Sequence, residues 1–99
     1  MYRLSQLAAE DFAAIYEYTL LSFGVVQADA YTEHLERTFY LLATSPGMGC
    51  ECSEIGEGVR RHAHHQHAIF YRPREGDIFI IRILHQRMDS VRHVFEPVH

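Results

Sequence analysis

Residues 77–89 read DIFIIRILHQRMD, and this stretch decides the fold. Five of the residues between 78 and 84 are isoleucine or leucine, which is typical of a strand buried on both faces. Arg82 interrupts the apolar run, and polar side chains crowd its end: His85, Gln86, Arg87 and Asp89. Polar groups that leave a rigid strand together are a common location for function. The exit of this strand is therefore the first candidate site.

Two more strands are predicted just before it. Residues 58–64 and 67–72 are joined by a tight connection at residues 65–66, and residues 73–76 make the next turn. Residues 46–58 contain five glycines or prolines and three glutamates, so we expect a loop there. Residues 88–95 have some helical spacing and are predicted to form a short C-terminal helix or a tail.

The first half of the chain predicts two helices. Residues 2–5 form a short strand, Ser5 caps a helix over residues 6 to about 23, and Gly24 ends it. The second helix starts near Val25 or Val26 and ends at Ser45. A one-glycine connection requires an antiparallel hairpin. Its apolar stripe is expected in the core: Leu7, Phe12, Ile15, Tyr16, Thr19 and Phe23, then Ala28, Tyr31, Leu35, Phe39 and Leu42.

These elements predict an α+β fold. The two-helix antiparallel hairpin packs on one face of a small, mainly antiparallel sheet, which consists of the short N-terminal strand and a three-stranded meander. The length of 99 residues suits a single domain over residues 1–99. No apolar run approaches the ~20 residues of a membrane span, and the N-terminus lacks a signal-peptide layout. We therefore expect a cytoplasmic protein without membrane contact.

The net charge of −4 is unevenly distributed. Residues 1–57 hold two arginines and nine acids, whereas residues 58–99 hold seven arginines, four acids and seven of the eight histidines. The chain has no lysine, and arginine binds carboxylate or phosphate in a fixed geometry, which favours specific docking of a partner. The overall acidity argues against a protein that coats nucleic acid through charge. The alternative is a solvated arginine face without function.

The densest group of metal-ligating side chains is the sequence HAHHQH, which begins at His62. A metal-binding module is one hypothesis, because Cys50 and Cys52 are near enough in sequence to add thiolates. However, the spacing matches no standard zinc pattern, and a turn must reverse the chain between His64 and His67. We predict a histidine-lined hairpin without metal, no cofactor, and two free thiols.

A second group combines arginines with a histidine, and in a meander its members are expected to converge on one sheet face. As an RNA-cleaving site it offers His85 as general acid, an arginine for the phosphate charge, and Glu51 or Glu54 as base. The same side chains equally suit partner docking. No serine lies in a glycine-flanked elbow and no glycine loop cradles phosphate, so nucleophilic or nucleotide chemistry is not supported. The members of this arginine–histidine group are Arg60, Arg61, Arg82, His85 and Arg87.

The chain resembles toxins of the RelE/ParE superfamily from bacterial toxin–antitoxin pairs, on the ParE side. The match spans nearly the whole chain, and residues 83–89 are its most family-specific part. In the first half it rests on residues 2–5, Ala8, Asp11, Phe12, Ile15, Tyr18, Thr19, Phe23, Gly24, Gln27, Ala28, Tyr31, Leu35, Leu42, Ala43 and Pro46. In the second half it rests on residues 58–61, 67–72 and 83–89.

The resemblance implies a RelE/ParE-like fold and a non-enzymatic toxin that stabilises the cleaved-DNA complex of DNA gyrase and blocks replication. It also implies a cognate antitoxin, whose disordered C-terminal segment folds across the toxin in a hetero-oligomer. Operator DNA is then bound only through the antitoxin. The alternative is a RelE-like ribosome-dependent mRNA endonuclease, from which the chain departs by its acidity, its lack of lysine and Gln86 in place of a tyrosine.

Residues 87–99, after the last strand, are the segment expected to reach gyrase. The predicted partner-binding residues are Arg60, Arg61, Arg82, His85, Arg87, Met88, Asp89 and Arg92. If the chain is a nuclease, the predicted catalytic set is Arg60, Arg61, His85 and Arg87. No residue is assigned to a metal.

Overall fold

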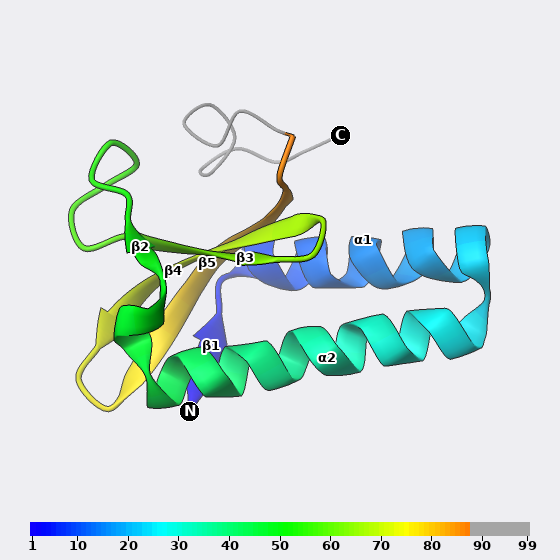
Figure 1. Cartoon of the computed structure of the whole chain (residues 1–99), viewed down its shortest axis with the longest axis horizontal. Helices are drawn as coiled ribbons and strands as arrows, with labels where there is room; N and C mark the ends of the chain where they lie inside the picture. Colours follow the sequence, from blue (N-terminus) through cyan, green and yellow to red (C-terminus); the bar gives the residue numbers. More distant parts are fainter. Residues whose placement is uncertain (88–99) are drawn as a thin grey trace.

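The computed structural model describes residues 1–87, which form two helices and a five-stranded sheet with the order β1-β5-β4-β3-β2 (Figure 1). Strand β1 runs parallel to β5, and the other neighbouring strands are antiparallel. The predicted α+β architecture is thus confirmed. The elements are β1 Tyr2–Leu4, α1 Gln6–Phe23, α2 Val25–Thr44, the 3₁₀ turn η1 Pro46–Met48, β2 Cys50–Glu51, β3 Arg60–His64, β4 His67–Arg74 and β5 Asp77–His85.

Both helix ends predicted from the sequence are confirmed. The Ser5 hydroxyl accepts a hydrogen bond from the Ala8 amide at 2.9 Å and donates one to the Ile81 carbonyl at 2.6 Å. Ser5 therefore caps α1 and fixes its first turn to β5. Gly24 joins the helices with φ 94°, a left-handed conformation that favours glycine. The two helices consequently fold back on each other along one side of the sheet.

The segment between α2 and β3 contains more structure than the predicted loop. It includes η1 and the edge strand β2, which pairs Cys50 with Arg61. The buried Tyr71 hydroxyl accepts from the Gly49 amide at 2.9 Å and donates to the Pro46 carbonyl at 2.6 Å. A Cβ on Gly49 would lie 2.5 Å from this hydroxyl oxygen, so only glycine fits. Strand β2 has only two residues, which is too short for an alternating pattern to show in the sequence, and this explains why it was missed.

Two further expectations need correction. Strand β4 continues to Arg74, two residues beyond the predicted end, because Pro73 still pairs with Ile78. Phe23 was expected in the core but is 66% exposed, since it lies at the far end of the hairpin, away from the sheet. The predicted C-terminal element at residues 88–95 lies outside the described residues.

Apolar side chains cover both faces of the sheet. On the helix-facing side, Leu35, Phe39 and Leu42 of α2 pack with Ile69, Tyr71 and other strand residues. On the opposite face a second cluster joins Cys52 and Val59 to the strands through Ala68, Phe70, Ile81 and Leu84. Strand β5 is therefore buried on both faces, as its composition predicts. Within residues 1–87, no helix is long and apolar enough to cross a membrane.

Candidate protein-binding surfaces

A β-bulge in β5 organises the polar end of this strand. Phe70 of β4 pairs with Arg82, whereas the next residue, Tyr71, pairs with Ile80, so Ile81 is the extra residue. Strand β1 covers β5 only as far as Ile80. Beyond that point the free edge of β5 is available to groups from α1.

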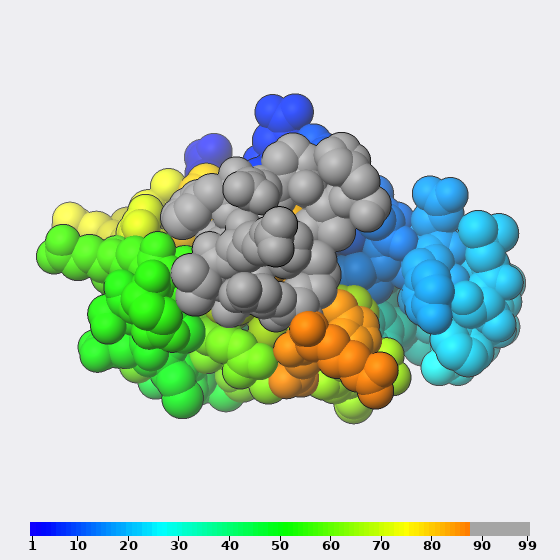
Figure 2. Space-filling model, turned by 90° about the horizontal axis from the view of Figure 1, so that it is seen from above, coloured from blue at the N-terminus to red at the C-terminus, as the bar shows by residue number. Residues whose placement is uncertain are grey.

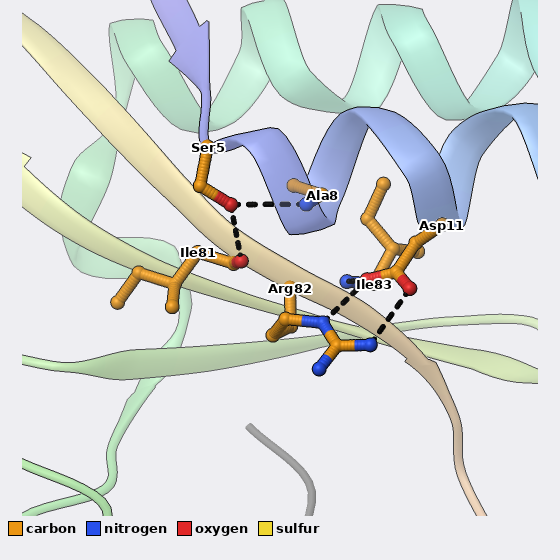
Figure 3. A network of polar contacts seen from close by, with 6 residues as sticks. All are labelled: Ser5, Ala8, Asp11, Ile81, Arg82 and Ile83. Atoms are coloured by element: carbon orange, nitrogen blue, oxygen red, sulfur yellow. Dashed lines mark hydrogen bonds and ion pairs between the residues drawn. The ribbon is translucent and has the colours of Figure 1, made fainter. Parts of the chain in front are cut away.

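Asp11 of α1 occupies this edge (Figure 3). Its carboxylate accepts hydrogen bonds from Arg82 Nε at 2.7 Å and Nη2 at 2.8 Å, and from the Ile83 amide at 3.0 Å. The Arg82 side chain is 1% exposed and that of Asp11 12%. A buried guanidinium requires such a bidentate partner, since an unpaired buried charge is very costly. The pair fixes α1 against the strand that carries the candidate site.

A groove of about 470 Å³ opens beside this ion pair, between α1 and the ends of β4 and β5. Its apolar wall consists of Leu7, Ala14, Ile15, Ile83 and Leu84, and Tyr18 also lines it. The polar lining residues are Glu10, Asp11, Gln66, His67, Arg82 and His85. An apolar groove with a few polar groups is the usual form of a site for a side chain or peptide segment.

Three histidines form a row across neighbouring strands at one end of this groove. His64 of β3 pairs with His67 of β4, which pairs with His85 of β5. The Tyr31 hydroxyl of α2 lies 2.6 Å from His67 Nδ1, and Thr38 Oγ1 lies 3.1 Å from His64 Nδ1. The row therefore contacts both helix α2 and the groove. The sequence does not indicate this contact, because it joins residues that are far apart in the chain.

Burial and the neighbouring imidazoles keep two rings of this row, those of His64 and His67, uncharged. Burial lowers the pKa of His67 to about 4, and His85 and His64 add to this effect. Burial, assisted by His65, His34 and His62, also lowers the pKa of His64. At neutral pH these two rings are therefore neutral hydrogen-bonding groups, which favours polar recognition over charge attraction.

The predicted convergence of the arginine–histidine set on one sheet face is wrong, because side chains alternate along a strand. Arg61 lies opposite Phe70, on the outer face of the sheet. Arg60 lies opposite Tyr71, on the face that the helices cover. His85, which lies opposite His67, is also on the helix-facing side. Arg82, in its turn, lies against Asp11. The five side chains thus occupy several environments, and only some of them lie on an accessible surface.

The arginines also differ in their bonding. Arg60 Nε donates to the Gly49 carbonyl at 2.9 Å and its Nη1 lies 3.5 Å from Glu51, so Arg60 stabilises the segment before β3. Arg61 Nη2 donates to the Gln86 side chain at 3.2 Å, and Arg87 is exposed. Arg61, Gln86 and Arg87 therefore form an accessible polar surface at the exit of β5. Met88, Asp89 and Arg92 lie outside the described residues.

The metal and nuclease hypotheses find little geometric support. Within residues 1–87, no three histidine, cysteine, aspartate or glutamate side chains are grouped to hold a metal ion. Cys50 is exposed on β2 and Cys52 is buried in the outer cluster, both as free thiols, while His64 contacts α2. Glu51, a predicted base, pairs with Arg60. The nuclease set of Arg60, Arg61, His85 and Arg87 is likewise divided between the two faces.

Sequence reasoning missed two residues of the site, Asp11 in the groove and Tyr31 beside His67. Asp11 is among the residues that carry the family resemblance, but its place in an early helical turn is explained by the helix dipole and indicates no role in a site. Tyr31 fits the apolar stripe of α2, so its hydroxyl contact with His67 was not anticipated. One usable signal was Arg82, since an arginine within a buried strand requires an acidic partner elsewhere in the chain.

Comparison with known proteins adds independent evidence. The family model described as "ParE toxin of type II toxin-antitoxin system, parDE" matches residues 2–90. Toxin ParE1 of Caulobacter vibrioides is 39% identical over 93 residues, covering 94% of this chain and 96% of the relative. Toxin ParE1 of Mycobacterium tuberculosis is 37% identical over 94 residues, with the same coverage of both chains.

A more distant relative and a solved structure agree with these matches. Toxin ParE of Escherichia coli is 33% identical over 89 residues, covering 89% of this chain and 86% of the relative. A chain of the structure titled "Chromosomal ParDE TA system from P. aeruginosa" superposes with a TM-score of 0.72. That match covers 85% of this chain and 92% of the other at 21% identity, so it is a likeness of fold.

Proposed function

Because this chain belongs to the ParE toxin family of type II toxin–antitoxin systems, we propose that it binds DNA gyrase, blocks replication and is held inactive by a cognate antitoxin. The observation that carries the proposal is the family match, which extends from β1 to the exit of β5. The inhibition rests on protein contact in the cytoplasm, where gyrase acts, and the toxin itself catalyses no reaction.

The antitoxin segment is proposed to dock in the groove between α1 and the ends of β4 and β5. The groove offers apolar side chains for anchoring, and the neutral His67 together with Gln66 offers hydrogen bonds. At the exit of β5, Arg61 and Arg87 provide positive charge for an acidic segment. A segment that folds as it binds can occupy both regions at once.

The predicted partner-binding residues fall into three groups. Arg61, His85 and Arg87 lie where a docked segment can reach them. Arg60 and Arg82 act through the structure, because Arg60 stabilises the segment before β3 and Arg82 is buried against Asp11. Met88, Asp89 and Arg92 are proposed, with the rest of residues 87–99, to contact gyrase.

Pulse-labelling tests the target of the toxin. The chain is induced in bacteria without its antitoxin, and incorporation of labelled thymidine and labelled methionine is followed over the first minutes. We expect DNA synthesis to stop while translation continues, and co-expression of the antitoxin to prevent the arrest. An early stop of translation would instead establish an mRNA endonuclease and reject the gyrase proposal.

A matched pair of variants tests the antitoxin groove. Ala14 lines the groove and Ala13 is its exposed neighbour on α1, so Ala14→Arg blocks the groove while Ala13→Arg adds the same side chain outside it. Affinity for the protein encoded beside the toxin gene is measured by titration calorimetry. We expect Ala14→Arg to weaken binding at least about tenfold and Ala13→Arg to leave it unchanged. Equal affinities of the two variants would place the antitoxin elsewhere.

A further inference from the structure

The turn between α1 and α2 carries a cluster of exposed apolar side chains. We call this cluster the hairpin tip, and it consists of Leu20, Leu21, Phe23, Val25 and Val26. Leu21 is 78% exposed, Phe23 66% and Val26 81%. Figure 1 shows the turn projecting beyond the strands, and Figure 2 shows it (cyan) at one end of the molecule. None of these side chains belongs to either of the apolar clusters on the sheet.

The folding of the hairpin does not account for these side chains. Gly24 makes the turn, and Ala28 and Thr19 are the buried residues nearest to it, so polar residues would serve equally well at the exposed positions. Side chains of these sizes expose on the order of 400 Å² of apolar surface, which is within the range of functional patches on monomers. Such a continuous patch indicates contact with another molecule.

The charges around the tip restrict what this molecule is. Residues 18–28 contain no charged side chain, and the nearest charges are Glu17 and Asp29. Across residues 13–33 there are three acids and neither lysine nor arginine. The tip is therefore an apolar knob with an acidic rim, in contrast to the arginines at the exit of β5.

A second copy of this chain is a poor occupant. Two tips facing each other would bury roughly half of the ~800 Å² per partner of a stable interface. Their acidic rims would also meet and repel. A concave partner encloses the knob from several sides, and basic groups around its opening would complement Glu17 and Asp29.

We propose that the hairpin tip inserts into an apolar recess with a basic rim on the cellular target of the toxin. This proposal rests on the proposed function, because it places the recess on the protein that the toxin inhibits. The tip lies 12 residues along α1 from Asp11, about 18 Å at the helical rise. The antitoxin groove extends along α1 as far as Tyr18, so the target surface adjoins this groove but shares no residue with it.

Serine substitutions at matched positions test this assignment. Phe23→Ser with Val26→Ser removes most of the knob, while Leu41→Ser replaces an apolar residue that is 49% exposed at the other end of α2. Growth arrest after induction without antitoxin is the first readout, because it requires no assumption about the target. Thermal unfolding and antitoxin affinity are measured in parallel. We expect the tip variant to need at least about tenfold more toxin for arrest, with unchanged unfolding and antitoxin binding.

Inhibition of purified gyrase is the second readout and separates the two proposals. If the unaltered chain arrests growth without affecting gyrase, the gyrase target is rejected and growth arrest alone decides the role of the tip. Glu17→Arg, which reverses a rim charge, is expected to weaken toxicity in the same assays. The proposal would be overturned if the tip variant kept full toxicity. It would also be overturned if the tip variant lost only as much toxicity as Leu41→Ser, or if it lost antitoxin affinity.

Discussion

Asp11 and Arg82, 71 residues apart in the chain, form a two-bond ion pair that joins the first helix to the last strand, with Nε and Nη2 of the arginine 2.7 and 2.8 Å from the carboxylate (Figure 3). The same carboxylate accepts the Ile83 amide at the edge of β5. Both residues line the proposed antitoxin groove. Stability and binding are therefore linked at this point.

Asp11→Ala is expected to destabilise the fold strongly. The change removes both bonds from the buried Arg82 guanidinium to Asp11 and the acceptor of the Ile83 amide, and breaking such a buried pair costs about 3–5 kcal/mol. Urea unfolding measures the loss. Glu10→Ala, at the exposed neighbouring position of α1, is the control and should change the free energy of unfolding by less than about 0.5 kcal/mol. Similar losses for both variants would contradict the importance of the pair.

Tyr71→Phe should loosen the segment between α2 and β3. The hydroxyl bonds to the buried Gly49 amide and the half-buried Pro46 carbonyl, and its removal takes a partner from each, for a loss of about 1–3 kcal/mol. Tyr40→Phe, at a tyrosine that is 56% exposed, is the matched control with little expected effect. Amide hydrogen exchange at Gly49 should accelerate in Tyr71→Phe alone. Unchanged exchange there would show that the hydroxyl does not hold the segment.

Acid should destabilise the fold through His67. In the unfolded chain its ring titrates near the ordinary value of 6.5, whereas the folded pKa is about 4. The unfolded state therefore binds more protons between these values, so the stability is fully present above pH 6.5 and is lost as the pH falls towards 4. Since the ring is partly exposed, we expect a loss of about 1–2 kcal/mol.

The variant His67→Gln isolates this contribution. It lacks the titrating ring, so its free energy of unfolding should fall less steeply than that of the unaltered chain between pH 7 and pH 4. The difference between the two proteins contains the His67 ring and its coupling to His64, which lowers the pKa of His67. Urea unfolding across this range measures the two slopes. Parallel slopes would mean that His67 accepts a proton as readily in the folded state as in the unfolded one.

Changing Arg60 to alanine is expected to affect mainly stability, whereas changing Arg61 to alanine is expected to affect mainly antitoxin affinity. Arg60→Ala removes the bond to the Gly49 carbonyl and should lower the stability by about 1–2 kcal/mol. Arg61→Ala removes one exposed bond to Gln86 and should cost less than about 0.5 kcal/mol. Antitoxin affinity should fall more for Arg61→Ala, and more so at low salt. Equal effects on stability and affinity would remove the distinction between the two residues.

Sequence patterns predicted much of the fold because its elements depend on neighbours in the chain. The cap at Ser5, the turn at Gly24 and the apolar stripe of α2 are local signals, and all three are confirmed. The candidate site was less predictable. The polar exit of β5 was found from the sequence, whereas the groove beside it was not, because its walls come from α1, β4 and β5.

By itself, the sequence determined the order of the elements, the antiparallel hairpin, the doubly buried last strand and the resemblance to ParE toxins. Only the tertiary structure decided which side chains meet. One extra residue, Ile81, changes the register of β5, and α1 then brings Asp11 to Arg82. Exposure of Phe23 likewise depends on where the sheet ends beneath the hairpin. The physical reason is that helical period and capping act over a few residues, whereas burial and ion pairing depend on packing between distant segments.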